Sequence, residues 1–199
     1  MSLFPLFLKL RGRRCLVVGA GKISEGKIAG LLAAGAKVTV VAPSATEKIQ
    51  AWRRARKLIW KKKAYETADL RGALLVVAST DSPKVHRRIF RDAQKFGVLC
   101  NIVDVPELCD FYYPSVVRRG ELQIAVSTAG ASPSLAKRLR RRFEQEFGPE
   151  YAAWLKQLRR KRQEIRAKKL PLAEQNRLLE VIAGEAAFQE FLRRGQPGP

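Results

Sequence analysis

The pattern Gly19-x-Gly21-x-x-Ser24 is the clearest candidate for chemistry in this sequence. In a turn between a strand and a helix, the first glycine permits a tight bend and the second lets the backbone approach a phosphate. The pyrophosphate of a dinucleotide then meets the helix N-terminus. Ser24 departs from the usual Gly or Ala but is small enough for close packing. We therefore expect a dinucleotide-binding turn; the alternative is a tight turn in an α/β protein that binds something else.

Polar residues also accompany two later apolar runs. Thr80 and Asp81 follow the run 74–78, and Asn101 and Asp104 belong to the end of the run 98–103. Because open α/β sheets bind ligands at the carboxyl ends of their strands, we expect these residues beside a cofactor. Asp104 is the candidate acid–base group, since desolvation at a buried strand end would suit it to proton transfer. The alternative is that Asp104 caps the turn before Pro106.

The end of the second apolar strand bears on cofactor choice. Pro43 and Ser44 stand where an Asp or Glu would hold the ribose hydroxyls, and no Arg adjoins them to bind a 2′-phosphate. Because that position offers no positive charge, we expect NAD rather than NADP.

A stable metal site is not predicted. The three cysteines (Cys15, Cys100 and Cys109) lack CxxC spacing, and His86 is the one histidine. It lies early in a predicted helix beside Arg87 and Arg88, so we expect a surface or helix-packing role for it. The cysteines are expected to be small apolar thiols of a reduced, cytoplasmic protein.

These residues need a framework, and the hydrophobic pattern supplies one. Short apolar runs alternate with segments of helical spacing, which predicts a doubly wound, Rossmann-like parallel sheet. The predicted strands are 15–18, 38–41, 58–60, 74–78 and 98–103, and the predicted helices are 23–32, 45–56 and 84–96.

The pattern changes after residue 104. Runs at 111–117 and 122–127 flank Arg118-Arg119-Gly120-Glu121, which predicts a β-hairpin. Ser132-Pro133 is typical of a helix start, and the chain from 134 to 194 is expected to be helical. The apolar residues of one stripe on this tail are Tyr151, Trp154, Leu155, Leu158 and Ile165.

The net charge of +21 points to an anionic partner. An anion at the helix start Ser132-Pro133 would meet Arg138 or Arg141. Nucleic acid is not the expected partner, because aromatic residues do not interleave with the basic clusters. No apolar run approaches the ~20 residues that span a bilayer, so no membrane partner is expected.

The ordered motifs resemble those of the precorrin-2 dehydrogenase and sirohydrochlorin ferrochelatase family, the N-terminal region of siroheme synthases. The resemblance implies three parts, which are an NAD-binding Rossmann domain (1–112), a central dimerisation region (113–147) and a small basic helical domain (148–199). It also implies a homodimer. The motifs that carry it are 10–13, 15–21, 78–81, 100–104, 111–115 and 125–133.

The resemblance also implies the activity, in which NAD accepts a hydride from precorrin-2 while a proton is lost, giving sirohydrochlorin. Asp104 carries the acid–base role. In members that also insert Fe²⁺, Asp104 is implicated again, and His86 is a second candidate for transient iron contact. The residues expected at the cofactor are Gly19, Gly21, Lys22, Ile23, Pro43, Ser44, Thr80, Asp81 and Asn101. Those expected at the octacarboxylate substrate are Ser127, Thr128, Ser132, Arg138 and Arg141.

Two alternatives stay open at this point. One is a Rossmann-fold NAD sensor whose basic helices bind nucleic acid, which the charge favours and the lack of a helix-turn-helix pattern disfavours. The other is an NAD-dependent oxidoreductase for a different anionic metabolite, with Asp104 as its base.

Overall fold

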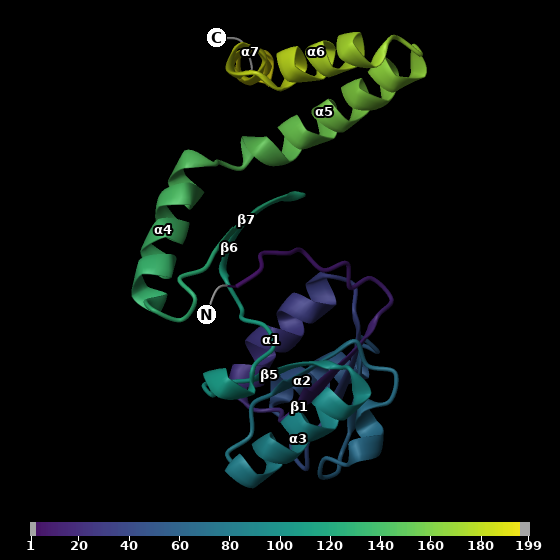
Figure 1. The fold of residues 1–199 in the computed structure, drawn as a ribbon, viewed down its shortest axis with the longest axis vertical. Coiled ribbons are helices and arrows are strands. Elements are labelled where there is room, and N and C mark those ends of the chain that lie inside the picture. The colour runs from purple at the N-terminus through teal and green to yellow at the C-terminus, as the bar shows by residue number, and fades with distance from the viewer. Residues whose placement is uncertain (1–2, 196–199) are drawn as a thin grey trace. The chain divides into compact units, whose positions relative to one another are not determined.

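A computed structural model describes residues 3–195, and these divide into two compact units that meet in sequence at Tyr112 and Tyr113 (Figure 1). The outer limits of the predicted first and third domains, residues 1 and 199, lie outside the described residues. Within residues 3–195, none of the helices combines the length and the apolar composition needed to cross a membrane.

The first unit is built on a parallel sheet of five strands in the order β3-β2-β1-β4-β5. This order confirms the predicted doubly wound sheet. Val18 at the end of β1 pairs with Val41 of β2 and with Ala78 of β4, so the carboxyl ends of neighbouring strands are level. The strands are β1 (Arg14–Val18), β2 (Lys37–Val41), β3 (Leu58–Lys61), β4 (Leu75–Ala78) and β5 (Leu99–Ile102).

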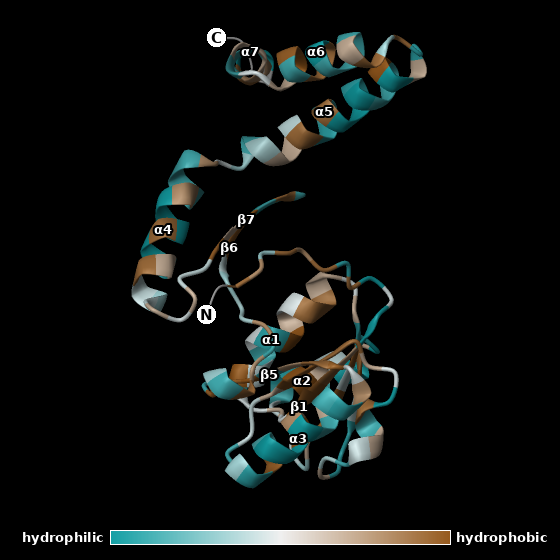
Figure 2. Ribbon diagram, in the orientation of Figure 1, coloured by the Kyte–Doolittle hydropathy of each residue, from teal (hydrophilic) through white to brown (hydrophobic). Residues whose placement is uncertain are grey.

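Helices cover both faces of this sheet. Val17 packs with helices α1 (Lys22–Ala33) and α2 (Glu47–Arg54), while its neighbour Leu16 packs with α3 (Pro83–Phe96) on the opposite face. Because both faces are covered, the strands are apolar at nearly every position (Figure 2). The short 3₁₀ helices η1 (Thr67–Leu70) and η2 (Pro106–Leu108) complete the unit.

Helix α3 shows how local chemistry fixes the element ends near the site. The hydroxyl of Ser82 accepts a hydrogen bond from the backbone N–H of Val85 at 3.4 Å, and Pro83 occupies the first turn. At the other end Gly97 takes the left-handed conformation, with φ of +63°. The loop before Ser82 is therefore held at the carboxyl end of β4.

The second unit contains an antiparallel hairpin, β6 (Ser115–Arg119) and β7 (Leu122–Val126), followed by four helices. The predicted strand at 111–117 was wrong in its start, because Phe111 packs against the core of the first unit. The predicted turn was also too wide, since Arg119 pairs with Leu122 around Gly120, whose φ is +60°. The helices are α4 (Pro133–Glu146), α5 (Glu150–Ala167), α6 (Leu172–Ala183) and α7 (Glu185–Gly195).

Aromatic rings form the core of the helical part. The predicted stripe of α5 does contribute buried side chains, Trp154 and Ile165. Trp154 lies 5.6 Å from the ring of Phe188, and that ring lies 4.6 Å from Tyr151, measured between centroids. The tail is thus a packed helical body.

Candidate functional site

The glycine turn after β1 is fastened to the turn after β4. Gly19 has φ of +100°, and a Cβ there would lie 2.4 Å from the carbonyl oxygen of Ser79, so only glycine fits. The buried hydroxyl of Ser24 donates to the carbonyl of Gly19 at 2.8 Å and lies 2.6 Å from the hydroxyl of Ser79. Ser24 therefore keeps the close packing expected at the third motif position and also links helix α1 to both turns.

Glycine occupies the second motif position for a different physical reason. Gly21 has φ of −82°, and a Cβ built there would meet no atom of the chain within 4 Å. Neither backbone strain nor internal packing thus requires glycine. Gly21 is also the N-cap of α1 and gives that helix no side-chain cap. Open space in front of uncapped N–H groups fits a bound pyrophosphate.

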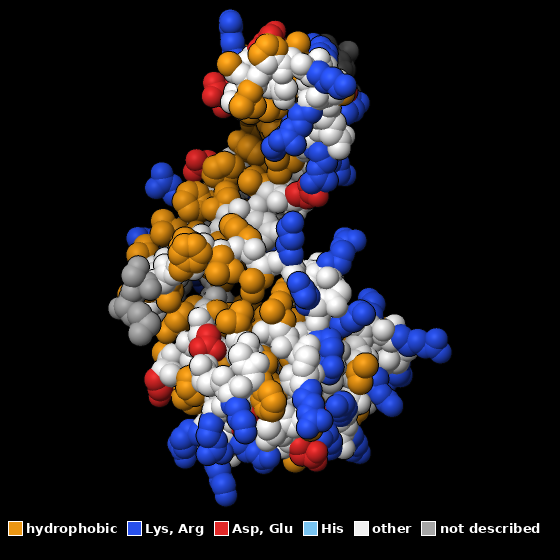
Figure 3. All heavy atoms as spheres, turned by 45° about the vertical axis from the view of Figure 1, so that its right-hand side comes forward, with side chains coloured by type: hydrophobic (Ala, Val, Ile, Leu, Met, Phe, Trp, Pro, Cys, Tyr) orange, Lys and Arg blue, Asp and Glu red, His pale blue; other side chains and the backbone are white. Residues whose placement is uncertain are grey.

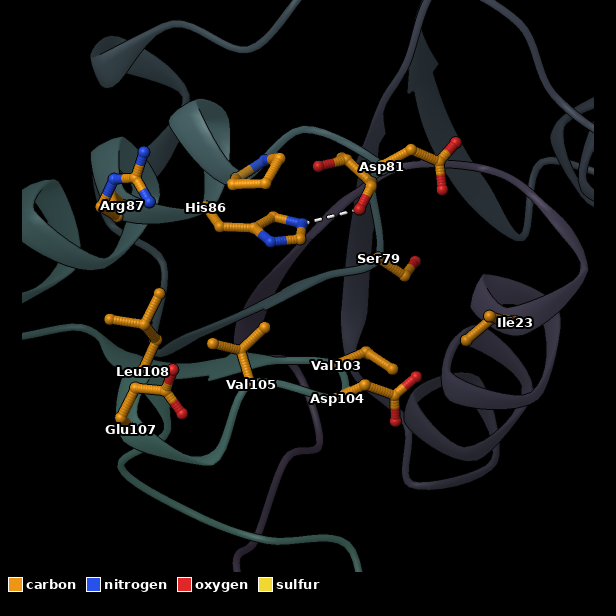
Figure 4. A pocket seen from close by; sticks show the side chains of 12 residues that line it. Ile23, Ser79, Asp81, His86, Arg87, Val103, Asp104, Val105, Glu107 and Leu108 are labelled. Carbon is orange, nitrogen blue, oxygen red and sulfur yellow. Dashed lines mark hydrogen bonds between the residues drawn. The ribbon is translucent and has the colours of Figure 1, made fainter.

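Beside this turn lies a cavity of about 560 Å³ at the carboxyl ends of β4 and β5 (Figure 4). It brings together Ile23 of α1, Thr80 and Asp81 after β4, His86 of α3 and Asp104 after β5. Thr80, Asp81 and Asp104 follow from the strand-end prediction, Ile23 was expected from the family resemblance, and His86 joins them through helix α3. The other lining residues are Ser79, Pro83, Arg87, Val103, Val105, Glu107 and Leu108.

Thr80 presents an unsatisfied polar atom at this cavity. Its side-chain oxygen is buried and has no hydrogen-bond partner within residues 3–194. A buried hydroxyl without a partner costs free energy, so a ligand that bonds to it would be favoured. With the open space at Gly21, this makes the residues present a good fit for a dinucleotide.

His86 is a helix-packing residue, one of the two roles expected for it. Its ring is buried, and Nε2 lies 2.7 Å from the carbonyl oxygen of Thr80. This contact holds the loop that carries Thr80 and Asp81. Within the described residues, no three His, Cys, Asp or Glu side chains are grouped so that they could hold a metal ion.

Asp104 differs from its expected environment. Its side chain is exposed, so the desolvation predicted from the strand-end position was wrong: Asp104 lies just past β5, outside the buried sheet. Its backbone is left-handed, with φ of +62°. Such a conformation is strained for a residue other than glycine, although Asp and Asn tolerate it best. The turn thus places Asp104 at the cavity on a strained backbone.

Lys27 was missed by the sequence analysis. It is half-buried on α1, and this burial lowers the pKa of its ammonium group, while the nearby charges of Asp104 and Cys109 act in the opposite direction. Helical spacing could have identified it, because Lys27 lies four residues after Ile23 and therefore on the same face of α1. The site contains a cation close to the carboxylate of Asp104.

Other predicted cofactor residues lie outside the cavity lining. Gly19, Gly21 and Lys22 form the adjoining turn, and Pro43 and Ser44 are exposed beyond β2. Asn101 differs from expectation, since its buried amide donates to the carbonyl of Phe111 at 2.7 Å. The amide of Asn101 therefore holds the segment after η2.

The cysteines behave as predicted apolar thiols. Burial raises the pKa of Cys15 to about 11, and burial, helped by the charge of Asp110, raises that of Cys100 to about 12. Both thiols stay protonated at neutral pH and are poor nucleophiles.

The expected substrate residues all lie in the second unit. The hydroxyls of Ser127, Thr128 and Ser132 accept hydrogen bonds from the backbone N–H groups of Ala129, Ser132 and Leu135 at 3.1, 3.1 and 3.2 Å. Each hydroxyl keeps its own O–H to donate, as binding a carboxylate requires. Arg138 and Arg141 are exposed on α4, and no ion pair of the described residues involves them.

Two family models match this chain. A model described as "Putative NAD(P)-binding" matches residues 6–115, and one described as "Sirohaem biosynthesis protein central" matches residues 119–146. The first match contains the glycine turn and the whole cavity, and the second contains the hairpin turn and α4.

Several siroheme synthases are similar in sequence. That of Methylobacillus flagellatus is 46% identical over 147 residues, which are 72% of this chain and 31% of the relative. That of Azotobacter vinelandii is 38% identical over 198 residues, which are 98% of this chain and 42% of the relative. The chain therefore spans less than half of the length of these relatives.

A solved structure named "SirC, precorrin-2 dehydrogenase" is similar over nearly the whole chain. The TM-score is 0.76 at 28% sequence identity, and the match covers 96% of this chain and 98% of that one. The comparisons do not support the alternative of an NAD sensor that binds nucleic acid.

Proposed function

This chain belongs to the NAD(P)-binding family that matches more than half of its length, and on that premise we propose that it is a precorrin-2 dehydrogenase of siroheme biosynthesis. The observation that carries the proposal is the cavity beside the glycine turn, which is lined both by Asp104 and by Thr80 with its unpartnered hydroxyl. The likeness to a structure named for this activity supports it.

The residues that would hold NAD(P) follow the strand ends. The Gly19–Ile23 turn and the N-terminus of α1 would bind the pyrophosphate, Pro43 and Ser44 the adenosine side, and Thr80 and Asp81 the nicotinamide side. When bound, the cofactor supplies the hydride acceptor. Asn101 would act indirectly, through the segment that it holds.

We place the proton of the reaction on Asp104. Precorrin-2 loses one hydride and one proton, and the exposed carboxylate at the cavity can accept that proton. The ammonium of Lys27 provides a cation near this carboxylate.

NAD is the preferred cofactor in this proposal. Lys61 at the end of β3 and Lys63 just after it form ion pairs with Asp69. The carboxylate of Asp69 lies 2.9 Å from the ammonium group of Lys61 and 3.0 Å from that of Lys63. Lys61 is in register with Val41 at the end of β2. These ion pairs leave that edge with less positive charge for a 2′-phosphate.

The second unit would bind the substrate and a second copy of the chain. The hydroxyls of Ser127, Thr128 and Ser132, with Arg138 and Arg141, would hold substrate carboxylates. We keep the division into parts 1–112, 113–147 and 148–199, and the homodimer, as proposals; the match of a central family model to 119–146 supports the middle part. Iron insertion through Asp104 and His86 stays a prediction from the resemblance.

An anaerobic assay with enzymatically generated precorrin-2 tests the proposal. NAD should give sirohydrochlorin, followed by absorbance, and NADP should give a slower reaction. Addition of Fe²⁺ shows whether siroheme forms above the spontaneous rate. No turnover with either cofactor from folded protein that binds NADH would overturn the proposed activity.

A further inference from the structure

Helix α3 carries a hollow whose lining residues are all cations. Lys84, Arg87, Arg88 and Arg91 surround a cavity of about 320 Å³. Their spacing of three, four and seven residues places them on one face of the helix. At ~1.5 Å per residue this α3 cationic face is about 10 Å long, comparable with the width of a tetrapyrrole ring.

Most of this charge is not balanced within the chain. Arg88 is held by the hydroxyl of Thr67 at 3.3 Å and by Asp92 at 3.8 Å. For Lys84, Arg87 and Arg91, the described residues provide no ion pair. Like charges three and four residues apart repel one another, so an anion bound at this face would relieve the repulsion.

The face adjoins the cavity of Asp104 through one shared residue. Arg87 lines both hollows, and Figure 4 shows it at the edge of the larger one. The larger cavity also has three carboxylates, those of Asp81, Asp104 and Glu107. An anionic ligand would be repelled by these acids and attracted by the cations of α3, so the charge pattern would orient it.

We propose that the α3 cationic face binds carboxylates of the tetrapyrrole substrate and so determines which edge of the ring approaches Asp104. This inference rests on the proposed function, which makes the substrate a polycarboxylate. The face is one of several basic surfaces (Figure 3), but it shares a residue with the cavity of Asp104. It adds Arg87 and Arg91 to the groups that bind substrate.

The test compares two double variants with the same change in charge. Arg87→Gln/Arg91→Gln removes two cations from the face, and Arg54→Gln/Lys57→Gln removes two exposed cations at the end of α2. The probes are uroporphyrin, an octacarboxylate, coproporphyrin, a tetracarboxylate, and NADH, titrated by fluorescence at several salt concentrations. Turnover of precorrin-2 is measured in parallel.

We expect about tenfold weaker binding of uroporphyrin by the first variant, since two charged contacts are lost. The affinity for coproporphyrin should fall by a smaller factor, and uroporphyrin binding should depend less steeply on salt concentration. In the control variant Arg54→Gln/Lys57→Gln, uroporphyrin affinity should change less than about twofold. NADH affinity should stay unchanged, which also shows that the variant is folded. The single variant Arg91→Gln, farther from the larger cavity, should raise KM for precorrin-2 with kcat unchanged.

The contrary outcomes separate the inference from the proposed function. Suppose that the wild type oxidises precorrin-2 normally, and that uroporphyrin affinity and KM are unchanged both in Arg87→Gln/Arg91→Gln and in Arg91→Gln. This result would overturn the inference and leave the proposed function intact. Duplex DNA is titrated in the same way as a fourth probe, and loss of DNA affinity by the Arg87→Gln/Arg91→Gln variant with uroporphyrin affinity retained would overturn the inference and assign the face to nucleic acid. A wild type that neither binds uroporphyrin nor oxidises precorrin-2 would overturn both proposals.

Discussion

The two units of this chain bury their apolar side chains differently. Among the described residues, the largest side chains that are fully buried all belong to the first unit, on both faces of its sheet. They are Leu16, Val17, Ile28, Val40, Val41, Ile49, Leu70, Leu75, Val76, Val77, Ile89 and Ile102.

The second unit relies on fewer and more aromatic contacts. Trp154 and Phe188 are 4% and 8% exposed, and their rings meet at tilted angles. On the same unit Leu172 and Val181 of α6 are 73% and 64% exposed. Exposed apolar side chains are not confined to this unit, since Phe4, Phe7 and Ile59 of the first unit are 85%, 67% and 62% exposed. The difference between the units therefore lies in their cores, which are aliphatic in the first unit and aromatic in the second.

This difference explains why the chemistry is assigned to the first unit. A close-packed aliphatic core is hardly compressible, so it can hold at its edge a strained residue such as Asp104 and an unsatisfied hydroxyl such as that of Thr80. The predictions below test this division.

The largest effect is expected from Asp104→Asn. Asn tolerates the left-handed backbone and keeps the size of the side chain, but it cannot accept the proton. Loss of a general base typically costs ~10²–10⁴ in rate, so dehydrogenation should fall by that factor while NADH affinity stays nearly intact. Initial rates with precorrin-2 and NADH titrations measure both.

Asp104→Ala is the companion variant. It should lose as much activity and, because Ala is strained at this φ, also some thermal stability. Unchanged turnover in either variant would remove Asp104 from the mechanism and leave the first unit without its assigned proton acceptor.

Substitutions at the two motif glycines should have different effects on thermal stability and on NADH affinity. Gly21→Asp places a negative charge in open space at the N-terminus of α1, so NADH affinity should fall about 100-fold or more with thermal stability kept. Gly19→Ala should lower thermal stability as well, because its Cβ would clash with the carbonyl of Ser79. Calorimetry and NADH titration distinguish the two. Wild-type NADH affinity in Gly21→Asp would contradict the placement of the pyrophosphate.

The two cores should respond independently to truncation. Ile28→Ala in the first unit and Trp154→Ala in the second should each cost about 2–5 kcal/mol of unfolding free energy. Because each unit has a core of its own, we expect two transitions in denaturant, each lowered by one variant alone. Tryptophan fluorescence and circular dichroism follow them. A single transition shifted equally by both variants would show that the units unfold together.

The sequence predicted the parts of the site that depend on periodicity. Strands β1 and β4 end in apolar residues, Gly19 and Ser79-Thr80 follow them, and parallel pairing brings these residues to one edge. This topology explains why Thr80, Asp81 and Asp104 were found from the sequence.

Features set by local tertiary contacts were not predicted. The exposure of Asp104 depends on the chain leaving the sheet after Ile102, and the start of β6 depends on Phe111 joining the first core. The amide of Asn101 is held by a carbonyl ten residues later. None of these contacts has a periodic signal, whereas Lys27 had one, its spacing of four residues from Ile23, that was not used.

The smallest effects on the free energy of unfolding are expected from ion pairs, and we compare one from each unit. Burial would raise the pKa of Asp69, but hydrogen bonds from Lys61, Lys63 and the backbone of Glu66 outweigh it, so the pKa is lowered on folding. A carboxyl with a lowered folded pKa stabilises the protein fully above its unfolded pKa of ~3.9, and this contribution is lost as the pH falls through the folded value. Asp69→Asn should therefore cost about 1–3 kcal/mol at pH 7 and flatten the acid limb of the stability curve.

Glu121→Gln is the matched variant in the second unit. Glu121 pairs with Arg159, and both side chains are more than half exposed. Exposed pairs contribute little because water and salt screen them. The denaturation midpoint of Glu121→Gln should therefore match that of the wild type at pH 7 and at pH 3. Denaturation followed between these two pH values measures both variants. Equal effects of the two substitutions would mean that the burial of Asp69 gives its ion pairs no advantage over the exposed pair of Glu121, and the contrast between the units would then concern apolar packing alone.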